Sequence, residues 1–226
     1  MKRVITVLLA VLLALSLAAC GSRVETKKLA GTWTCTVDAT DRMNAAAEQA
    51  LGLSAADGTA QMPLQLVLTV TEDGAYTLRY DSDAVRTALD AYAAALHPAA
   101  VESVYAAAEE QGLSREEYDA AMEKAGITMD DMVAAIFAGV DEEELLSLLT
   151  GRSAAITGYC RAESGQLYLA DTAADLTETA DCLSYTLSDG IMTWTDAQGE
   201  LSSQLTEEEQ ELLRVPLTWT KQEESK

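Results

Sequence analysis

The chain has 226 residues, with 37 acidic side chains against 15 Lys and Arg, a formal net charge of −22. Such a charge repels the phosphates of nucleic acids and anionic lipid headgroups, so no nucleic-acid partner is expected. The chain has one histidine, His97, and no C-x-x-C pair, so the sequence predicts no metal site, and nothing in it calls for a cofactor.

The first twenty residues have the pattern of an export signal. Lys2 and Arg3 precede an unbroken apolar run at residues 4–15, and small residues follow just before Cys20. A basic start, a short apolar core and small residues at the cleavage point are the parts of a secretory signal. The apolar run is shorter than the roughly 20 residues that a membrane-spanning helix needs.

This stretch resembles a bacterial lipoprotein signal. The resemblance implies cleavage after residue 19 and attachment of diacylglycerol and a palmitate-type acyl chain to Cys20, which would anchor the protein in a membrane. Cleavage would remove two basic residues and no acidic ones, leaving 13 Lys and Arg against 37 acids. We therefore predict a signal peptide at 1–19, a tether at 20–29, and a lipid-anchored protein on the extracytoplasmic side of the bacterial cell envelope.

The chain after the tether begins with alternating apolar and polar residues, the period of a half-buried strand. The alternation predicts strands at 31–37, 64–70 and 76–80. Asp73-Gly74 between the last two is a strong hairpin signal. A short helix, capped by Asp41 and reaching about Leu51, is expected between the first two strands.

Residues 82–151 are predicted to be a helical insertion with an internal repeat. Each copy has a glycine, an apolar residue, a capping residue and acids, and the copies begin at Gly112, Gly126 and Gly139. The glycine suits the left-handed position after a helix end, and an acid three residues after the cap completes a capping box. The expected caps are Ser114, Thr128 and Asp141. With a helix boundary at Pro98, we predict five short helices that form a small subdomain or a lid.

A second group of strands follows the insertion. Their predicted positions are 156–161, 167–169, 183–187, 192–194 and 217–219, with a second Asp-Gly hairpin at 189–190. Short antiparallel strands joined by tight turns favour a closed barrel or a sandwich. The predicted fold is α+β: an antiparallel eight-stranded barrel, split between 30–81 and 152–222, with the helical insertion between its halves.

Gly31-Thr32-Trp33, at the start of the first strand, resembles the G-x-W opening of lipocalins and related calycin barrels. The resemblance covers residues 31–80 and 153–221 and is nearest to small bacterial lipoproteins with a lipocalin-like barrel. It implies that Trp33 closes the barrel floor and that a basic residue near the last strand packs over it, either Lys221 or Arg214. The helical insertion departs from the typical lipocalin pattern.

Three cysteines remain once Cys20 carries lipid. An odd number in an exported protein predicts one disulfide and one thiol. We predict a bond between Cys35 and Cys160, because each shares the apolar face of its strand, whereas Cys182 falls on the opposite face. A bond between Cys160 and Cys182 is the alternative.

Six aromatic residues fall on the predicted inward faces and could line a ligand site: Trp33, Tyr76, Tyr80, Tyr185, Trp194 and Trp219. The same set would also suit an ordinary core, because an eight-stranded barrel holds either packed side chains or one small ligand. The packed interior is the favoured interpretation.

No catalytic residue is predicted. The sequence has no G-x-S-x-G elbow to accompany His97, and the acidic pairs coincide with helix starts, where they serve as caps. We therefore expect a non-catalytic module that binds a small apolar ligand or an envelope protein. The alternative is a carboxylate-dependent hydrolase of the cell envelope, whose two acids could lie far apart in sequence.

Overall fold

The computed structural model describes residues 25–53, 60–137, 147, 155–177, 181–195 and 212–223. Its centre is a closed barrel of eight antiparallel strands in sequence order, in which the last strand pairs with the first. The strands are β1 (Gly31–Asp38), β2 (Pro63–Val70), β3 (Ala75–Tyr80), β4 (Ile156–Glu163), β5 (Gln166–Ala170), β6 (Asp181–Ser188), β7 (Ile191–Thr195) and β8 (Leu217–Lys221). The predicted eight-stranded antiparallel barrel is therefore confirmed.

Burial along the strands follows the alternation in the sequence. In β1, Trp33, Cys35 and Val37 are buried, and the residues between them are half-buried or exposed. Residues 31–38 of β1 pair with residues 63–70 of β2 in one continuous register. Because successive side chains of a strand point to opposite faces, this register places the alternate apolar residues of both strands inside the barrel, whereas Val67 of β2 is buried on the opposite face.

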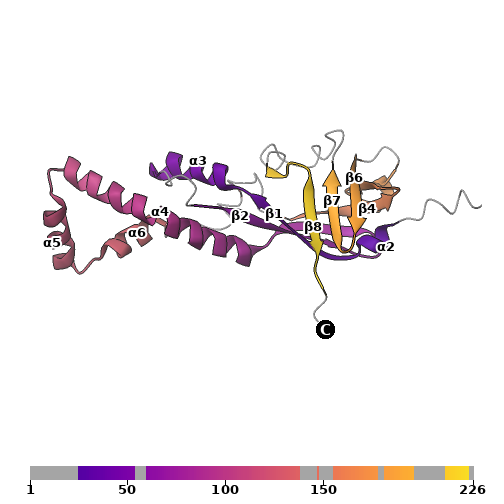
Figure 1. Ribbon diagram of the computed structural model, residues 1–226, viewed down its shortest axis with the longest axis horizontal. Coiled ribbons are helices and arrows are strands. Elements are labelled where there is room, and N and C mark those ends of the chain that lie inside the picture. The colour runs from indigo at the N-terminus through magenta and orange to yellow at the C-terminus, as the bar shows by residue number, and fades with distance from the viewer. Residues whose placement is uncertain are drawn as a thin grey trace, which may run out of the picture.

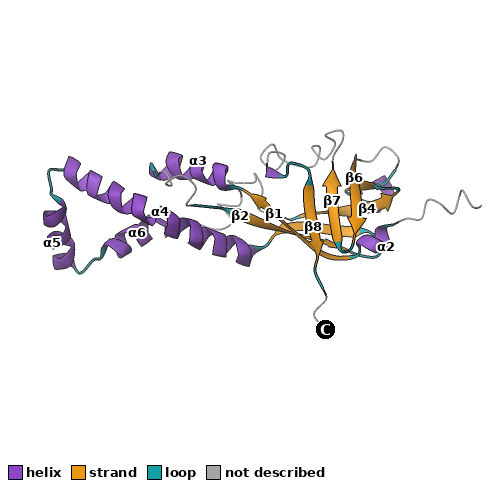
Figure 2. Ribbon diagram, viewed as in Figure 1, coloured by secondary structure: helices purple, strands orange, loops and turns teal. Residues whose placement is uncertain are grey.

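The barrel end at which the described chain begins is closed by α2 (Thr26–Leu29) (Figures 1 and 2). Leu29 is 1% exposed, and its carbonyl accepts a 2.7 Å hydrogen bond from the indole of Trp33. The Thr26 hydroxyl accepts a 3.0 Å bond from the backbone N–H of Ala162. The last residues of the expected tether are thus folded onto the barrel, because burial of Leu29 and pairing with β4 hold them there.

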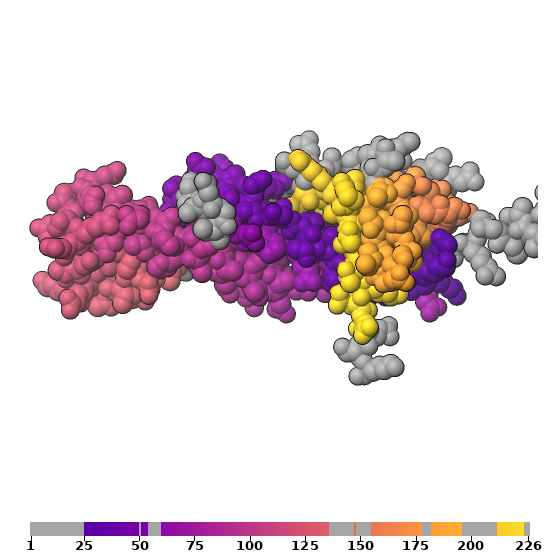
Figure 3. Space-filling view, viewed as in Figure 1, coloured from indigo at the N-terminus to yellow at the C-terminus, as the bar shows by residue number. Residues whose placement is uncertain are grey.

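Three helices follow β3 and form an arm: α4 (Ser82–Glu110), α5 (Arg115–Ala125) and α6 (Met129–Phe137). At 1.5 Å per residue, the 29 residues of α4 span about 43 Å. The arm leaves the barrel at the end opposite α2, so the molecule is elongated (Figures 1 and 3). None of the described helices is both long enough and apolar enough to cross a bilayer.

The base of the arm shares the core of the barrel. Val85, Tyr92 and Leu96 of α4 are buried in one cluster with the inward residues of β2. The helix α3 (Thr40–Leu51), between β1 and β2, packs in the same cluster, and its Asn44 accepts a 2.7 Å hydrogen bond from the Tyr92 hydroxyl. The first half of α4 is therefore continuous with the barrel in its packing.

The expected helix boundary at Pro98 is wrong. The structure has one continuous helix with Pro98 in its interior, although proline leaves the carbonyl of Ala94 without its usual N–H donor. Leu96 and Ala100 on either side are both fully buried. The two residues share one face of the helix only if the helix continues through Pro98. Their burial therefore outweighs the preference of proline for a helix start.

The predicted cap at Asp41 is also wrong. The helix α3 begins at Thr40, whose N–H donates a 2.9 Å hydrogen bond to the carboxylate of Asp38. Asp41 lies in the first turn instead, where a negative charge favours the positive end of the helix dipole.

Candidate functional site

The interior of the barrel contains a cavity of about 40 Å³. Its lining is apolar and includes Leu29 from α2, Leu68 from β2, Cys160 from β4 and Trp194 from β7. A cavity that holds benzene measures about 150 Å³. This cavity is sufficient for a group the size of one or two waters, and the described side chains around it are packed.

Of the six aromatic residues predicted to line a ligand site, only Tyr76 and Trp194 border this cavity. Trp219 packs against Trp194 with ring centroids 4.7 Å apart. Trp33 is fully buried beneath α2, and Tyr80 packs at the side of the core. The set predicted from the strand pattern is therefore divided among several parts of the core.

Tyr185 is held by the chain that enters the barrel. It is 5% exposed, and its hydroxyl donates a 3.1 Å hydrogen bond to the carboxylate of Glu25. Burial, together with this hydrogen bond, raises the pKa of Tyr185 well above its ordinary value. The contact ties β6 to the segment that precedes α2.

Lys221 is the basic residue that covers Trp33. Its ammonium lies 5.3 Å from the centroid of the indole ring. A side-chain carbon at Gly31, which has a φ of 127°, would lie 2.8 Å from Cε of Lys221, so glycine leaves room for the lysine there. Arg214, the other predicted candidate, instead lines a surface groove beside α3.

The predicted disulfide between Cys35 and Cys160 is not formed, and both residues are buried thiols. Cys35 lies on β1, which pairs with β2 and β8, and Cys160 lies on β4, which pairs with β3 and β5. Two strands separate the cysteines around the barrel. Burial raises the pKa of Cys35 to about 11 and that of Cys160 to about 12.

The alternative bond between Cys160 and Cys182 is also absent. Cys160 of β4 pairs with Leu169 of β5, whereas Cys182 of β6 pairs with Tyr168, the residue before Leu169 in β5. Adjacent residues of a strand point to opposite faces, so the two cysteines lie on opposite sides of the barrel wall.

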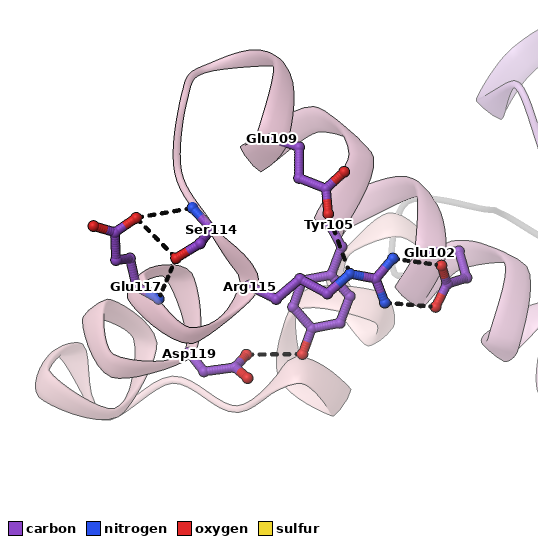
Figure 4. A network of polar contacts seen from close by, with 7 residues as sticks. All are labelled: Glu102, Tyr105, Glu109, Ser114, Arg115, Glu117 and Asp119. Atoms are coloured by element: carbon purple, nitrogen blue, oxygen red, sulfur yellow. Dashed lines mark hydrogen bonds and ion pairs between the residues drawn. The ribbon is translucent and has the colours of Figure 1, made fainter.

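The distal part of the arm is held together by a network around Arg115 (Figure 4). Its guanidinium makes a two-pronged contact with Glu102 at 2.8 and 3.1 Å and reaches Glu109 at 3.3 Å. The same group lies 4.7 Å from the ring centroid of Tyr105, whose hydroxyl donates a 2.8 Å bond to Asp119. The network fixes α5 on the end of α4.

Sequence reasoning missed this network. A signal was available, because Glu102, Tyr105 and Glu109 are spaced by three and four residues and therefore share one face of a helix. The pairing of that face with Arg115 required the angle at which α5 returns, and that angle is a tertiary property.

The acidic pairs at helix starts act as the sequence predicts. Ser114 and Glu117 form a complete capping box at α5. The Thr128 hydroxyl accepts a 3.1 Å bond from the N–H of Asp131, and the Asp131 carboxylate accepts a 2.9 Å bond from the N–H of Thr128. The third copy of the repeat, with Gly139 and Asp141, lies outside the described residues.

His97 contacts Asp130 at the start of α6, with 3.1 Å between Nε2 and the carboxylate oxygen. The imidazole thus links the middle of α4 to the returning helix. Among the described residues, no group of three or more His, Cys, Asp and Glu side chains is placed to hold a metal ion.

In the described part of the chain, five carboxyl groups have a pKa below the ordinary value, each because hydrogen bonds stabilise the charged form: Glu25, Asp73, Glu102, Glu117 and Asp131. The principal donors are Lys28 for Glu25 and Arg115 for Glu102. A catalytic acid needs the opposite shift, towards a protonated carboxyl at neutral pH. These carboxylates are therefore suited to structural contacts.

No protein-family model, curated protein or solved structure matches this chain.

Proposed function

We propose that this protein is a non-catalytic binding module, lipid-anchored in the bacterial cell envelope, whose helical arm contacts a protein partner. The observation that carries the proposal is the contrast between the two halves of the molecule. The cavity described inside the barrel measures only about 40 Å³, whereas the arm extends from the end opposite the start of the described chain (Figure 1).

The filled interior favours a protein partner over a small apolar ligand. A ligand the size of benzene would have to displace packed side chains, and interiors packed at crystal-like density resist such insertion. The resemblance to lipocalins is part of the proposal as a statement about architecture. The contact between Trp33 and Lys221 and the order of the eight strands support it.

The geometry of the arm supports a contact at a distance from the anchor. The lipid on Cys20 would lie on the side of α2, and the second half of α4, which is about 43 Å long in total, extends beyond the opposite end of the barrel. The helix α5 at the end of the arm has no buried residue, and Leu113 and Ile127 at its two ends are 39% and 42% exposed. Large exposed apolar side chains are common anchors of protein interfaces.

The anchor is tested by metabolic labelling with a fatty-acid probe. The wild-type protein should incorporate the probe, and Cys20→Ala should not. Labelling of the Cys20→Ala variant would contradict the proposed anchor without affecting the proposed contact of the arm.

The partner contact is tested by site-specific photocrosslinking of the full chain in its own host. A photoreactive residue at Ala121, which is exposed on α5, should crosslink to a discrete protein. The same residue at Thr69, exposed on the outer face of β2, is the control and should not capture that protein. Equal crosslinking from both positions, or none from Ala121, would contradict the proposal.

A truncation provides a second readout. Because Val85, Tyr92 and Leu96 belong to the common core, removal of the whole insertion would also remove part of that core. Replacement of residues 101–150 by a short flexible linker retains these three residues. The truncated protein should keep its barrel and lose the crosslinked partner.

A further inference from the structure

A surface groove of about 580 Å³ lies between α4 and the outer face of the β1–β2 ribbon. The helix starts beside the ribbon because the N–H of Asp81 donates a 2.8 Å hydrogen bond to the carbonyl of Gln65 (Figure 1). Ala84, Ala88 and Ala91 of α4 line one wall, and their spacing places them on one face of the helix. Between Ala84 and Ala91 this wall is about 10 Å long.

The lining of the groove combines apolar and uncharged polar groups. The alanine methyl groups and the ring of Pro63 supply the apolar part. The polar part comprises the amides of Gln61 and Gln65 and the hydroxyls of Thr36 and Thr87. Among the described residues that line the groove none is charged, although charged residues make up 23% of the chain.

The polar groups of the lining retain hydrogen-bonding capacity. The side-chain amides of Gln61 and Gln65 form no hydrogen bond with any other described residue, and each offers two donor hydrogens and an acceptor oxygen. The Thr87 hydroxyl donates its proton to the carbonyl of Asp83 at 2.9 Å, which leaves its oxygen able to accept. The groove therefore presents both donors and acceptors to a ligand.

We propose that this groove binds an uncharged saccharide. A sugar ring has a rim of hydroxyl groups that can donate and accept, and a face of C–H groups that packs on methyl groups and a proline ring. The volume lies within the range of about 300–1,000 Å³ that is typical of small-molecule sites. The site is separate from the partner contact at the distal end of the arm.

Other ligand chemistries fit the lining less well. An anion finds no cationic side chain among the described lining residues and is repelled by the net charge of −22. A wholly apolar ligand would remove four polar side chains from water without giving them partners, which is costly. An extended peptide would need a free strand edge for main-chain pairing, but the floor of the groove is a strand face.

The test is nuclear magnetic resonance titration of the intact protein with maltotriose and chitotriose, observing the side-chain amide signals. Loss of one signal in each of Gln61→Ala and Gln65→Ala assigns those signals. At least one trisaccharide should shift both amides in the wild-type protein. A longer chain of the same sugar shows whether the groove is built for a glycan or for a free sugar. The longer chain displaces the trisaccharide in the first case and does not displace it in the second.

Two leucine variants of α4 provide the matched comparison. Ala91→Leu fills the groove and should weaken trisaccharide binding about tenfold or more. Ala94→Leu adds the same side chain at an exposed position of α4 outside the groove and should leave binding unchanged. The proposal is overturned if neither sugar shifts the two amides, if both leucine variants bind alike, or if an uncharged peptide shifts these amides and the sugars do not.

Discussion

The barrel has two Asp-Gly hairpins, and the backbone of a neighbouring strand lies close to the side-chain position of the glycine in only one of them. Substitution of both glycines by alanine therefore measures how much this close approach contributes to stability. Gly74, in the β2–β3 turn, has a φ of 89°, and Gly190, in the β6–β7 turn, has a φ of 77°. An alanine in the left-handed region costs about 1–2 kcal/mol. Both substitutions therefore carry the same conformational cost.

The surroundings of the two glycines differ. A side-chain carbon at Gly74 would lie 2.4 Å from the carbonyl oxygen of Cys160, whereas at Gly190 the nearest atom is Cβ of Lys221, 3.8 Å away. Both glycine carbonyls accept a hydrogen bond from the neighbouring strand, Gly74 from the N–H of Cys160 at 2.7 Å and Gly190 from the N–H of Lys221 at 2.8 Å, but only at Gly74 does the clash threaten that bond. Relief of the clash would displace the turn, which costs about 1–3 kcal/mol for overpacking and about 1 kcal/mol for the lost bond.

We therefore expect Gly74→Ala to lower the free energy of unfolding by about 3–6 kcal/mol, and Gly190→Ala by about 1–2 kcal/mol. The total stability of a domain is typically about 5–15 kcal/mol, so Gly74→Ala should be severely destabilised. Urea unfolding followed by tryptophan fluorescence measures both, because Trp33, Trp194 and Trp219 are all buried. Equal losses in the two variants would refute the close packing of the β2–β3 turn against β4.

Four further outcomes are expected. An alkylating reagent at neutral pH should modify Cys182 in the folded protein and reach Cys35 and Cys160 only in denaturant, because both are buried and burial raises their pKa values to about 11 and 12. The thiols of Cys35 and Cys160 ionise near pH 9.0 in the unfolded chain and only near 11 and 12 in the folded protein. Their contribution to the free energy of unfolding should therefore be complete below pH 9.0 and lost as the pH rises through 11 and 12. A Cys160→Ala variant whose stability depends on pH as that of the wild type does would contradict this. Arg115→Lys cannot reproduce the two-pronged contact, so amide exchange in α5 should accelerate while that of the barrel stays the same; equal exchange rates would argue against the network. Gly126→Val should destabilise the α5–α6 turn by about 1–2 kcal/mol through backbone strain alone, since no atom lies within 4 Å of the added carbon, and unaltered exchange protection there would show that the strain is absent.

The features predicted correctly from the sequence are those set by neighbours along the chain. Alternation of apolar and polar residues has the period of a strand, and the barrel buries the alternate residues that this pattern selects. The capping box of Ser114 and Glu117 joins residues three apart and forms wherever the helix begins. Both kinds of pattern need only a few ångströms of chain and therefore survive any tertiary arrangement.

The features that the sequence left undecided depend on residues far apart in the chain. Strand order around the barrel separates Cys35 from Cys160, and burial of the flanking residues carries α4 through Pro98. The two Asp-Gly turns have the same residues at their tips, yet only at Gly74 would an added side-chain carbon collide with the backbone of the adjacent strand. The same reason accounts for the candidate sites: an aromatic residue on an inward face becomes either core or ligand wall according to how completely the opposite strands fill the space, and here they leave about 40 Å³.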